Sequence, residues 1–283
     1  MRKEVVSCLL CSYNAESFID ATIFSILHQT YESLEILVWD DGSTDRTLQK
    51  LQQWKEKDKR IQIFFDHWVK RWPYGWLNFL LKKAEGEFVA IQDHDDLWHR
   101  EKIAKQVAFL DTHVELVGCG TATLMWYEGD QKGFVYCLKE GSRTLHPSLM
   151  FRNDGKARYP HQVYMNDAYF QKKVLCKGEN LIVNLSETLT FHRVRSWSQN
   201  YSYRWFGFRK KDVQMIFYLH PVRYACCVLV FECFRKMLYP LLVRVGCWRW
   251  IDKIERFPFV LMSEKVERFG KERLEKMGFY NVW

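Results

Sequence analysis

Residues 88–96 read FVAIQDHDD, an apolar run that ends in three carboxylates within four residues. A short apolar run bounded by polar residues is typical of a strand buried on both faces of a parallel sheet. In open α/β sheets, ligands bind at the carboxyl ends of such strands. The stretch therefore predicts a central strand whose end presents Asp93, Asp95 and Asp96 to a ligand.

The segments on either side of this run alternate between strand-like and helix-like patterns. We predict strands at 5–11, 34–39, 61–65 and 88–91, further strands from 116 to 136, and helices between the first four. Strands that alternate with helices need crossover connections, which produce a mostly parallel sheet flanked by helices. We expect Asn14 to cap the first helix and the helix after the aspartates to begin at Leu97.

The pattern changes near residue 205. We expect residues 1–205 to form one α/β domain with halves of about 1–112 and 113–205. Residues 206–283 lack the alternation and are rich in Arg, Lys, Trp, Phe and Leu, so we expect a C-terminal helical appendage. Two interpretations of this basic, aromatic segment stay open: helices packed on the domain, or helices lying on an anionic membrane surface.

Composition excludes several classes of protein. With 48% hydrophobic and 27% charged residues, the chain can bury a core and is not disordered. Its nine cysteines lack the spacing of a disulfide framework or zinc site, which indicates free thiols in a reducing compartment. Because no signal peptide or membrane-spanning run is present, we expect a cytoplasmic protein, with the inner face of the membrane as a peripheral site.

The residues alone allow two interpretations of the aspartate cluster. Close carboxylates repel one another unless a cation offsets their charge, and Mg²⁺ or Mn²⁺ binds carboxylates together with substrate phosphates. The alternative is a solvated turn in which Asp96 only caps the next helix. Asp41, which also follows a predicted strand, fits either a ligand-reading carboxylate or an ordinary strand-to-helix turn. Acidic clusters at strand ends argue against nucleic acid as a partner of the net +8 chain.

Four segments carry a resemblance to a known family. They read VSCLLCSYN at 6–14, SILHQTY at 25–31, DDGSTD at 40–45 and DHDDLW at 93–98. In this order and spacing they resemble family 2 glycosyltransferases with the GT-A fold, over about residues 4–200. The resemblance implies a Rossmann-like domain that moves a sugar from a nucleotide-sugar donor, with a UDP-sugar expected first, to a glycan or lipid-linked acceptor.

The resemblance also implies roles at the matching positions. Tyr13, near Ser12, would pack on the nucleotide base, and Asp41 would read that base. Asp95 would contact the ribose and donor sugar, and Asp96 would bind the divalent ion, Mg²⁺ or Mn²⁺, with Asp95 beside it. The first half of the domain would then hold the donor and the second half the acceptor.

The second half supplies the expected catalytic base. The HPSLMFR segment at 146–152 is similar to the acceptor-side strand of the family, and Asn166-Asp167 lies on its acidic pair. The second residue of that pair is the usual base of inverting members, which makes Asp167 the candidate. The alternative for Asp167 is a charge that complements a helix N-terminus.

The chain departs from the family pattern at two places. The family often has a His that can approach the metal at the position of Arg195. Three alternatives follow: His192 binds the ion instead, the ion has fewer protein ligands, or Arg195 supports the diphosphate directly. Leu77-Asn78 replaces a frequent Arg-Asn. An inactive nucleotide-sugar-binding scaffold on the same fold is therefore the second hypothesis, although Asp93, which opens and supports the motif, is present with the other aspartates.

Overall fold

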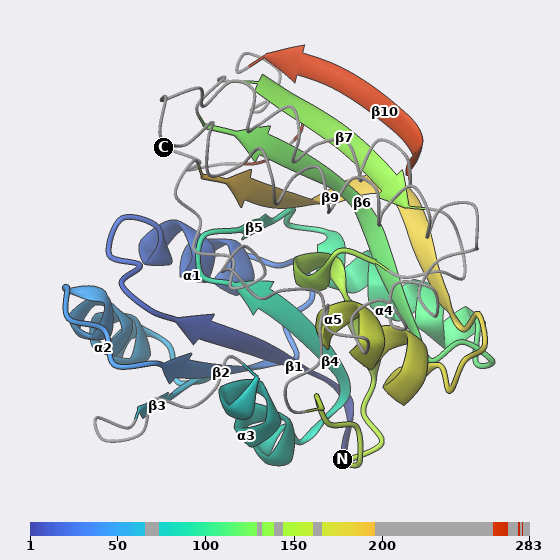
Figure 1. Ribbon diagram of the computed structural model, residues 1–283. Helices are drawn as coiled ribbons and strands as arrows, with labels where there is room; N and C mark the ends of the chain where they lie inside the picture. Colours follow the sequence, from blue (N-terminus) through green and yellow to red (C-terminus); the bar gives the residue numbers. More distant parts are fainter. Residues whose placement is uncertain are drawn as a thin grey trace, which may run out of the picture.

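The computed structural model describes residues 1–65, 74–128, 132–138, 144–160, 166–195 and 263–270, with Met277 and Phe279. These residues form a ten-stranded mixed sheet with helices on both faces (Figure 1). The strands are β1 (Arg2–Ser12), β2 (Leu34–Asp40), β3 (Ile61–Phe65), β4 (Gly86–Asp93), β5 (Leu97–Trp98), β6 (Gly118–Tyr127), β7 (Lys132–Leu138), β8 (Met150–Arg152), β9 (Ile182–Val194) and β10 (Ser263–Gly270). The helices are α1 (Ile19–Leu27), α2 (Thr47–Lys57), α3 (Gly75–Lys83), α4 (Lys102–Thr112) and α5 (Asn166–Tyr169), with a 3₁₀ turn, η1 (His146–Ser148), and a π-helical stretch, η2 (Phe170–Leu175).

The sheet has a parallel half and a mixed half. The order β10-β7-β6-β8-β4-β1-β2-β3 places β1 at the centre of the parallel strands, paired with β2 on one side and β4 on the other. On the far side of β4, the pairs with β8, β6, β7 and β10 are antiparallel, while β9 runs parallel to β6. The four predicted N-terminal strands all lie within strands of the structure, and the predicted α/β class is confirmed.

Two apolar cores cover the two faces of the parallel half. Side chains of β1 alternate, so that Cys8 and Leu10 pack against α1, α2 and α4 while Leu9 packs against α3. Ile23 and Leu80 are fully buried in these cores, one on each face. Burying a side chain of this size contributes roughly 1.5–3 kcal/mol relative to leaving it exposed. Burial on both faces explains why these strands have continuous apolar runs.

A buried carboxylate fixes where β4 begins. Glu35 on β2 accepts hydrogen bonds from the backbone nitrogens of Glu85 (2.7 Å) and Gly86 (3.0 Å) and from the hydroxyl of Ser7. Arg2 pairs with the same carboxylate at 2.9 Å. A Cβ at Gly86 would lie 2.6 Å from the carbonyl oxygen of Val5, so only glycine fits this approach. These contacts set the register that brings the end of β4 level with the end of β1.

Two local predictions are wrong. Asn14 does not cap α1: it has a φ of +46°, and its side chain accepts a hydrogen bond from the backbone nitrogen of Thr44 at 2.8 Å. Leu97 does not begin a helix, because Leu97 and Trp98 form β5 and pair with β9; α4 begins at Lys102. In both places a tertiary partner replaces the local hydrogen bond that the sequence pattern favours.

Part of the predicted helical appendage is a strand. Within 206–283, residues 263–270 form β10, which pairs antiparallel with β7. An edge strand such as β7 has unpaired backbone groups, and a further strand satisfies them. Apart from Met277 and Phe279, the rest of the predicted appendage lies outside the described residues. Among the described helices, none is long and apolar enough to cross a bilayer.

Lys102 is an exception to the apolar character of the core around α4. It is fully buried, its amine donates to Gln106 Oε1 at 2.7 Å, and that amine lies 4.2 Å from the centre of the Trp98 ring. Burial lowers the pKa of the Lys102 amine to about 7, because the charged form loses its hydration.

We therefore expect Lys102→Met to change how stability depends on pH. The folded amine has the lower pKa, so the unfolded chain binds the extra proton between about pH 7 and 10, and the stability contribution of Lys102 rises with pH there. The free energy of unfolding of the wild type should gain about 1.4 kcal/mol per pH unit relative to the variant. Chemical denaturation across this window measures the difference. An equal pH response would contradict it, and Lys82→Met, at an exposed position, is the matched control.

Candidate active site

The carboxyl ends of β1, β2 and β4 meet at one edge of the sheet. Ser12 pairs in register with Asp40, and Cys11 pairs with Asp93. This arrangement brings the two predicted acidic segments, 40–41 and 93–96, to neighbouring strand ends, where α/β sheets bind ligands.

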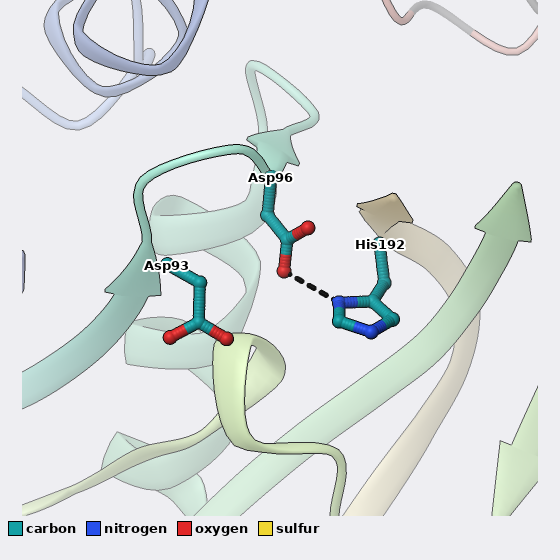
Figure 2. Close-up of side chains that lie close together, drawn as sticks. All are labelled: Asp93, Asp96 and His192. Carbon is teal, nitrogen blue, oxygen red and sulfur yellow. Dashed lines mark hydrogen bonds and ion pairs between the residues drawn. The ribbon is translucent and has the colours of Figure 1, made fainter. Parts of the chain in front are cut away.

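Three side chains from distant parts of the chain gather beside this edge. Ligand atoms of Asp93, Asp96 and His192 all lie within 4.8 Å of one another. Figure 2 shows them converging from the end of β4, the turn before β5, and β9. The pairing of β5 with β9 makes this possible, because it places Phe191 opposite Leu97 and so carries His192 next to Asp96.

Asp96 is fully buried and bonded through both carboxylate oxygens. Oδ1 accepts from the backbone nitrogen of Arg193 at 2.9 Å, and Oδ2 lies 2.7 Å from Nδ1 of His192. The turn that carries Asp96 is held from two sides, since its carbonyl oxygen accepts from Thr22 Oγ1 and Gln92 Nε2, each at 3.1 Å. The interpretation of Asp96 as a solvated helix cap is therefore wrong.

The charges of the cluster shift the pKa values of Asp96 and His192. Burial raises the pKa of Asp96 to about 6, and the carboxylates of Asp95 and Asp93 act in the same direction, against the opposing effect of His192. Burial alone would lower the pKa of His192, but the facing carboxylates, that of Asp96 first, outweigh it and raise this pKa to about 9. At neutral pH the pair is thus a carboxylate and an imidazolium, and a cation that takes His192 as a ligand must displace its proton.

The three residues fit a divalent cation. Two carboxylates supply the hard oxygen ligands that Mg²⁺ and Mn²⁺ prefer, and these ions commonly complete their coordination with substrate phosphates. The imidazole suits Mn²⁺ better than Mg²⁺, because Mg²⁺ binds nitrogen ligands less readily. Of the three predicted ligands, Asp96 and His192 lie in this cluster, whereas Asp95 does not; Asp93 lies there in its place.

Asp95 instead pairs with Arg195. Its carboxylate lies 2.8 Å from a terminal guanidinium nitrogen of Arg195, whose side chain also stacks over the ring of Phe18 at 5.0 Å. The Nε of Arg195 is buried and has no hydrogen-bond partner among the described residues. A buried donor without a partner costs about 1–3 kcal/mol, which an anionic ligand beside it would recover.

The other residues predicted to bind the nucleotide-sugar donor lie around the ends of β1 and β2. The Ser12 hydroxyl is buried and donates to Asp40 Oδ1 at 3.0 Å, so this side chain fixes the strand ends together. Tyr13 is 46% exposed. Trp39 Nε1 lies 3.4 Å from Asp41 Oδ1 and orients that carboxylate.

Asp167 lies in the first turn of α5 and is half-buried. Its charge reaches two tyrosines near the cluster: burial raises the pKa of Tyr74, and Asp167 and Asp93 raise it further. The pKa of Tyr159 is raised by burial first, with the same two carboxylates among the further causes. Asp167 is therefore close enough to Tyr74 and Tyr159 for its charge to act on both phenols.

Comparison with known proteins agrees with this geometry. The model of the family described as glycosyl transferase family 2 matches residues 7–123, a segment that contains Ser12, Tyr13, Asp41 and the 93–96 turn. This segment is therefore similar to glycosyl transferase family 2. The match ends before Asp167, His192 and Arg195, so the roles of these three residues rest on their positions in the fold.

A curated relative has a similar sequence, and solved structures extend the likeness in fold beyond the matched segment. The chain is 39% identical over 109 residues to the Escherichia coli enzyme named UDP-Glc:alpha-D-GlcNAc-diphosphoundecaprenol beta-1,3-glucosyltransferase WfaP. The alignment covers 38% of this chain and 42% of WfaP. S. aureus TarS 1-349 in complex with UDP-GlcNAc superposes with a TM-score of 0.58 at 22% identity, over 75% of this chain and 64% of TarS.

A second solved structure is the mannosyltransferase PcManGT from Pyrobaculum calidifontis in complex with GDP-Man and Mn²⁺. It superposes with a TM-score of 0.54 at 19% identity, over 69% of this chain and 58% of PcManGT. These likenesses confirm the predicted GT-A fold. The first curated relatives are matched over only 36% to 56% of their own length.

The fold also brings in a residue that we did not predict as part of the site. His146, on η1, lies with its Nδ1 3.6 Å from Asp93 Oδ1. Burial would raise the pKa of Asp93, but the facing His146 outweighs it, and the pKa is lowered. The signal available in the sequence was the HPSLMFR segment at 146–152, which indicated an acceptor-side strand and gave no reason to pair its first residue with Asp93.

Proposed function

We propose that this chain is a metal-dependent, inverting glycosyltransferase that moves a sugar from a nucleotide-sugar donor to an acceptor hydroxyl. The observation that carries the proposal is the cluster of Asp93, Asp96 and His192 at the carboxyl ends of parallel strands in a domain similar to glycosyl transferase family 2. A carboxylate-rich site of this kind binds a cation and a diphosphate together. The same cluster speaks against an inactive scaffold.

The donor we propose is a UDP-sugar, with Mn²⁺ or Mg²⁺ as cofactor. WfaP is named for UDP-Glc and the TarS structure contains UDP-GlcNAc, while PcManGT was solved with GDP-Man and Mn²⁺. Tyr13 offers an exposed ring for the base, and Asp41 offers an oriented carboxylate for its polar edge. The imidazole of His192 favours Mn²⁺ as the ion of choice.

Residues of the chain hold the leaving group. Asp93, Asp96 and His192 would hold the divalent ion, which when bound supplies Lewis-acid stabilisation of charge on the diphosphate. The Nε of Arg195, buried and unpartnered among the described side chains, would donate a hydrogen bond to an anionic oxygen of the diphosphate. The pairing of Arg195 with Asp95 keeps the guanidinium in place before the donor arrives.

Asp167 would act as the general base. Its carboxylate accepts the proton of the acceptor hydroxyl while that oxygen attacks the anomeric carbon, a contribution of about 10²- to 10⁴-fold. Attack on the face opposite the diphosphate inverts the anomeric configuration. Since the acceptor of WfaP is a diphosphoundecaprenol-linked sugar by its name, we propose a lipid-linked or cell-surface glycan here. Membrane association of 206–283, most of which lies outside the described residues, stays a prediction.

Calorimetric titration of UDP, GDP and dTDP into the chain, with and without Mn²⁺, tests the proposal. We expect one of the three nucleotides to bind, and to bind at least about tenfold more tightly with Mn²⁺, because the ion bridges carboxylates and diphosphate. Sugar transfer from the corresponding nucleotide sugars is then measured by nucleotide release. Absence of binding by all three nucleotides in both conditions would contradict the proposal.

A further inference from the structure

His146 joins the site through a second partner on the far side of its ring. While Nδ1 faces Asp93, Nε2 lies 3.0 Å from the hydroxyl of Tyr159. A neutral imidazole has one donor and one acceptor nitrogen, and a carboxylate only accepts. The arrangement therefore favours the form in which Nδ1 carries its hydrogen toward Asp93, with Nε2 accepting from the phenol.

Tyr159 is held firmly enough to impose this orientation. Its ring stacks with that of Tyr74, at a centroid distance of 5.1 Å and an interplanar angle of 17°, and with that of Phe170, at 3.8 Å and 11°. Its backbone is bound by both side-chain atoms of Asn78: the nitrogen of Tyr159 donates at 2.7 Å, and its carbonyl oxygen accepts at 2.8 Å. The phenol oxygen thus has little freedom to leave His146.

The turn that carries His146 is anchored from the other side. Trp98 Nε1 donates to the carbonyl oxygen of Pro147 at 2.9 Å, and Gln106 Nε2 donates to that of Ser148 at 3.0 Å. The imidazole of His146 is only 14% exposed. Both the backbone and the ring of His146 are therefore fixed before any ligand binds.

Asp93 differs from Asp96 in how its carboxylate is supported. Both oxygens of Asp96 are engaged by β9, through the nitrogen of Arg193 and the ring of His192. Among the described residues, the ion-pair contact of the Asp93 carboxylate is with His146, whereas His192 and His94 act on it through their charge. Without it, this carboxylate would be free to rotate away from Asp96 and His192.

We propose that His146, oriented by Tyr159, is a positioning residue that aims the Asp93 carboxylate at the cation site. The proposal rests on the proposed function, because it concerns the same candidate metal ligands. Partners that orient metal ligands typically change metal affinity by about 10- to 100-fold when removed. His146 and Tyr159 act as one unit, since the phenol fixes the ring and the ring fixes the carboxylate.

The test measures Mn²⁺ affinity by calorimetry on the full chain, alone and with UDP, in parallel with thermal unfolding. We expect His146→Leu to weaken Mn²⁺ binding by about 10- to 100-fold and Tyr159→Phe, which keeps the ring stack, to weaken it by about 3- to 10-fold. His146→Asn places an amide N–H where Nδ1 lies and should restore most of the affinity. In that background, Tyr159→Phe should have no further effect. Tyr31→Phe, whose hydroxyl bonds to Glu4 away from the site, is the control.

The possible outcomes distinguish failure of this proposal from failure of the proposed function on which it rests. A wild-type chain that binds neither Mn²⁺ nor nucleotide overturns both. Wild-type Mn²⁺ affinity in His146→Leu and Tyr159→Phe, in a chain that does bind metal and nucleotide, overturns only the positioning role. Equal losses of Mn²⁺ affinity in His146→Leu and His146→Asn also overturn the positioning role. A role in packing alone would not depend on the N–H that asparagine restores. If His146→Leu does not fold, the Mn²⁺ affinity of Tyr159→Phe, measured alone and in the His146→Asn background, decides whether the positioning role holds.

Discussion

Replacing Asp96 with asparagine is expected to abolish metal-dependent nucleotide binding and to lower kcat/KM by at least about 10²-fold. The carboxylate is the most buried member of the cluster, and the amide of asparagine carries no charge to offset a divalent ion. Lewis-acid stabilisation of a leaving group is worth several kcal/mol, and each 1.36 kcal/mol is about tenfold in rate. Calorimetry with Mn²⁺ and the nucleotide that binds the wild type, followed by initial rates, measures the loss.

Asparagine is the right replacement because it preserves the fold around this position. Its amide oxygen can still accept the hydrogen bond that the backbone nitrogen of Arg193 makes to Asp96 Oδ1. Asp111→Asn, an exposed aspartate on α4, controls for the general loss of one negative charge. Unchanged Mn²⁺ dependence in Asp96→Asn, with an unchanged melting temperature, would remove Asp96 from the metal site.

The second large effect is expected from Asp167→Asn, which should lower kcat by about 10²- to 10⁴-fold and leave donor affinity within about twofold of the wild type. A general base contributes to the transition state and not to donor binding, so kcat falls while the donor dissociation constant stays. Single-turnover rates and calorimetric donor binding separate the two quantities. A loss of donor affinity that equals the loss of rate would reassign Asp167 to the donor pocket.

The sequence predicted the parallel half of the fold well because its signals are local. Strands buried on both faces leave apolar runs such as 5–11 and 88–91, and each lies in a strand of the structure. The places where strands end are equally visible, since the aspartates at 40–41 and 93–96 interrupt those runs. The family resemblance added the roles of Tyr13, Asp41 and the 93–96 turn, which the strand pattern alone left open.

Local signals failed where a distant segment supplied the hydrogen bond. Asn14 has the character of a helix cap, yet its side chain bonds to Thr44 across two loops. Leu97 follows a capping residue, yet it enters a strand because β9 offers it a backbone ladder. In each case the partner lies far away in the sequence, so a pattern that covers one helical turn or one strand does not include it.

The sequence by itself therefore determined the α/β class, the four parallel strands and the strand ends at which carboxylates gather. Only the tertiary structure decided which carboxylates lie together. Asp93 and Asp95 are alike in the sequence, but Asp95 faces Arg195 while Asp93 faces Asp96 and His192. The physical reason is that His192 lies on β9, about a hundred residues after the aspartates, and Arg195 follows β9 directly. These side chains come next to the aspartates only when β9 pairs with β5 and β6.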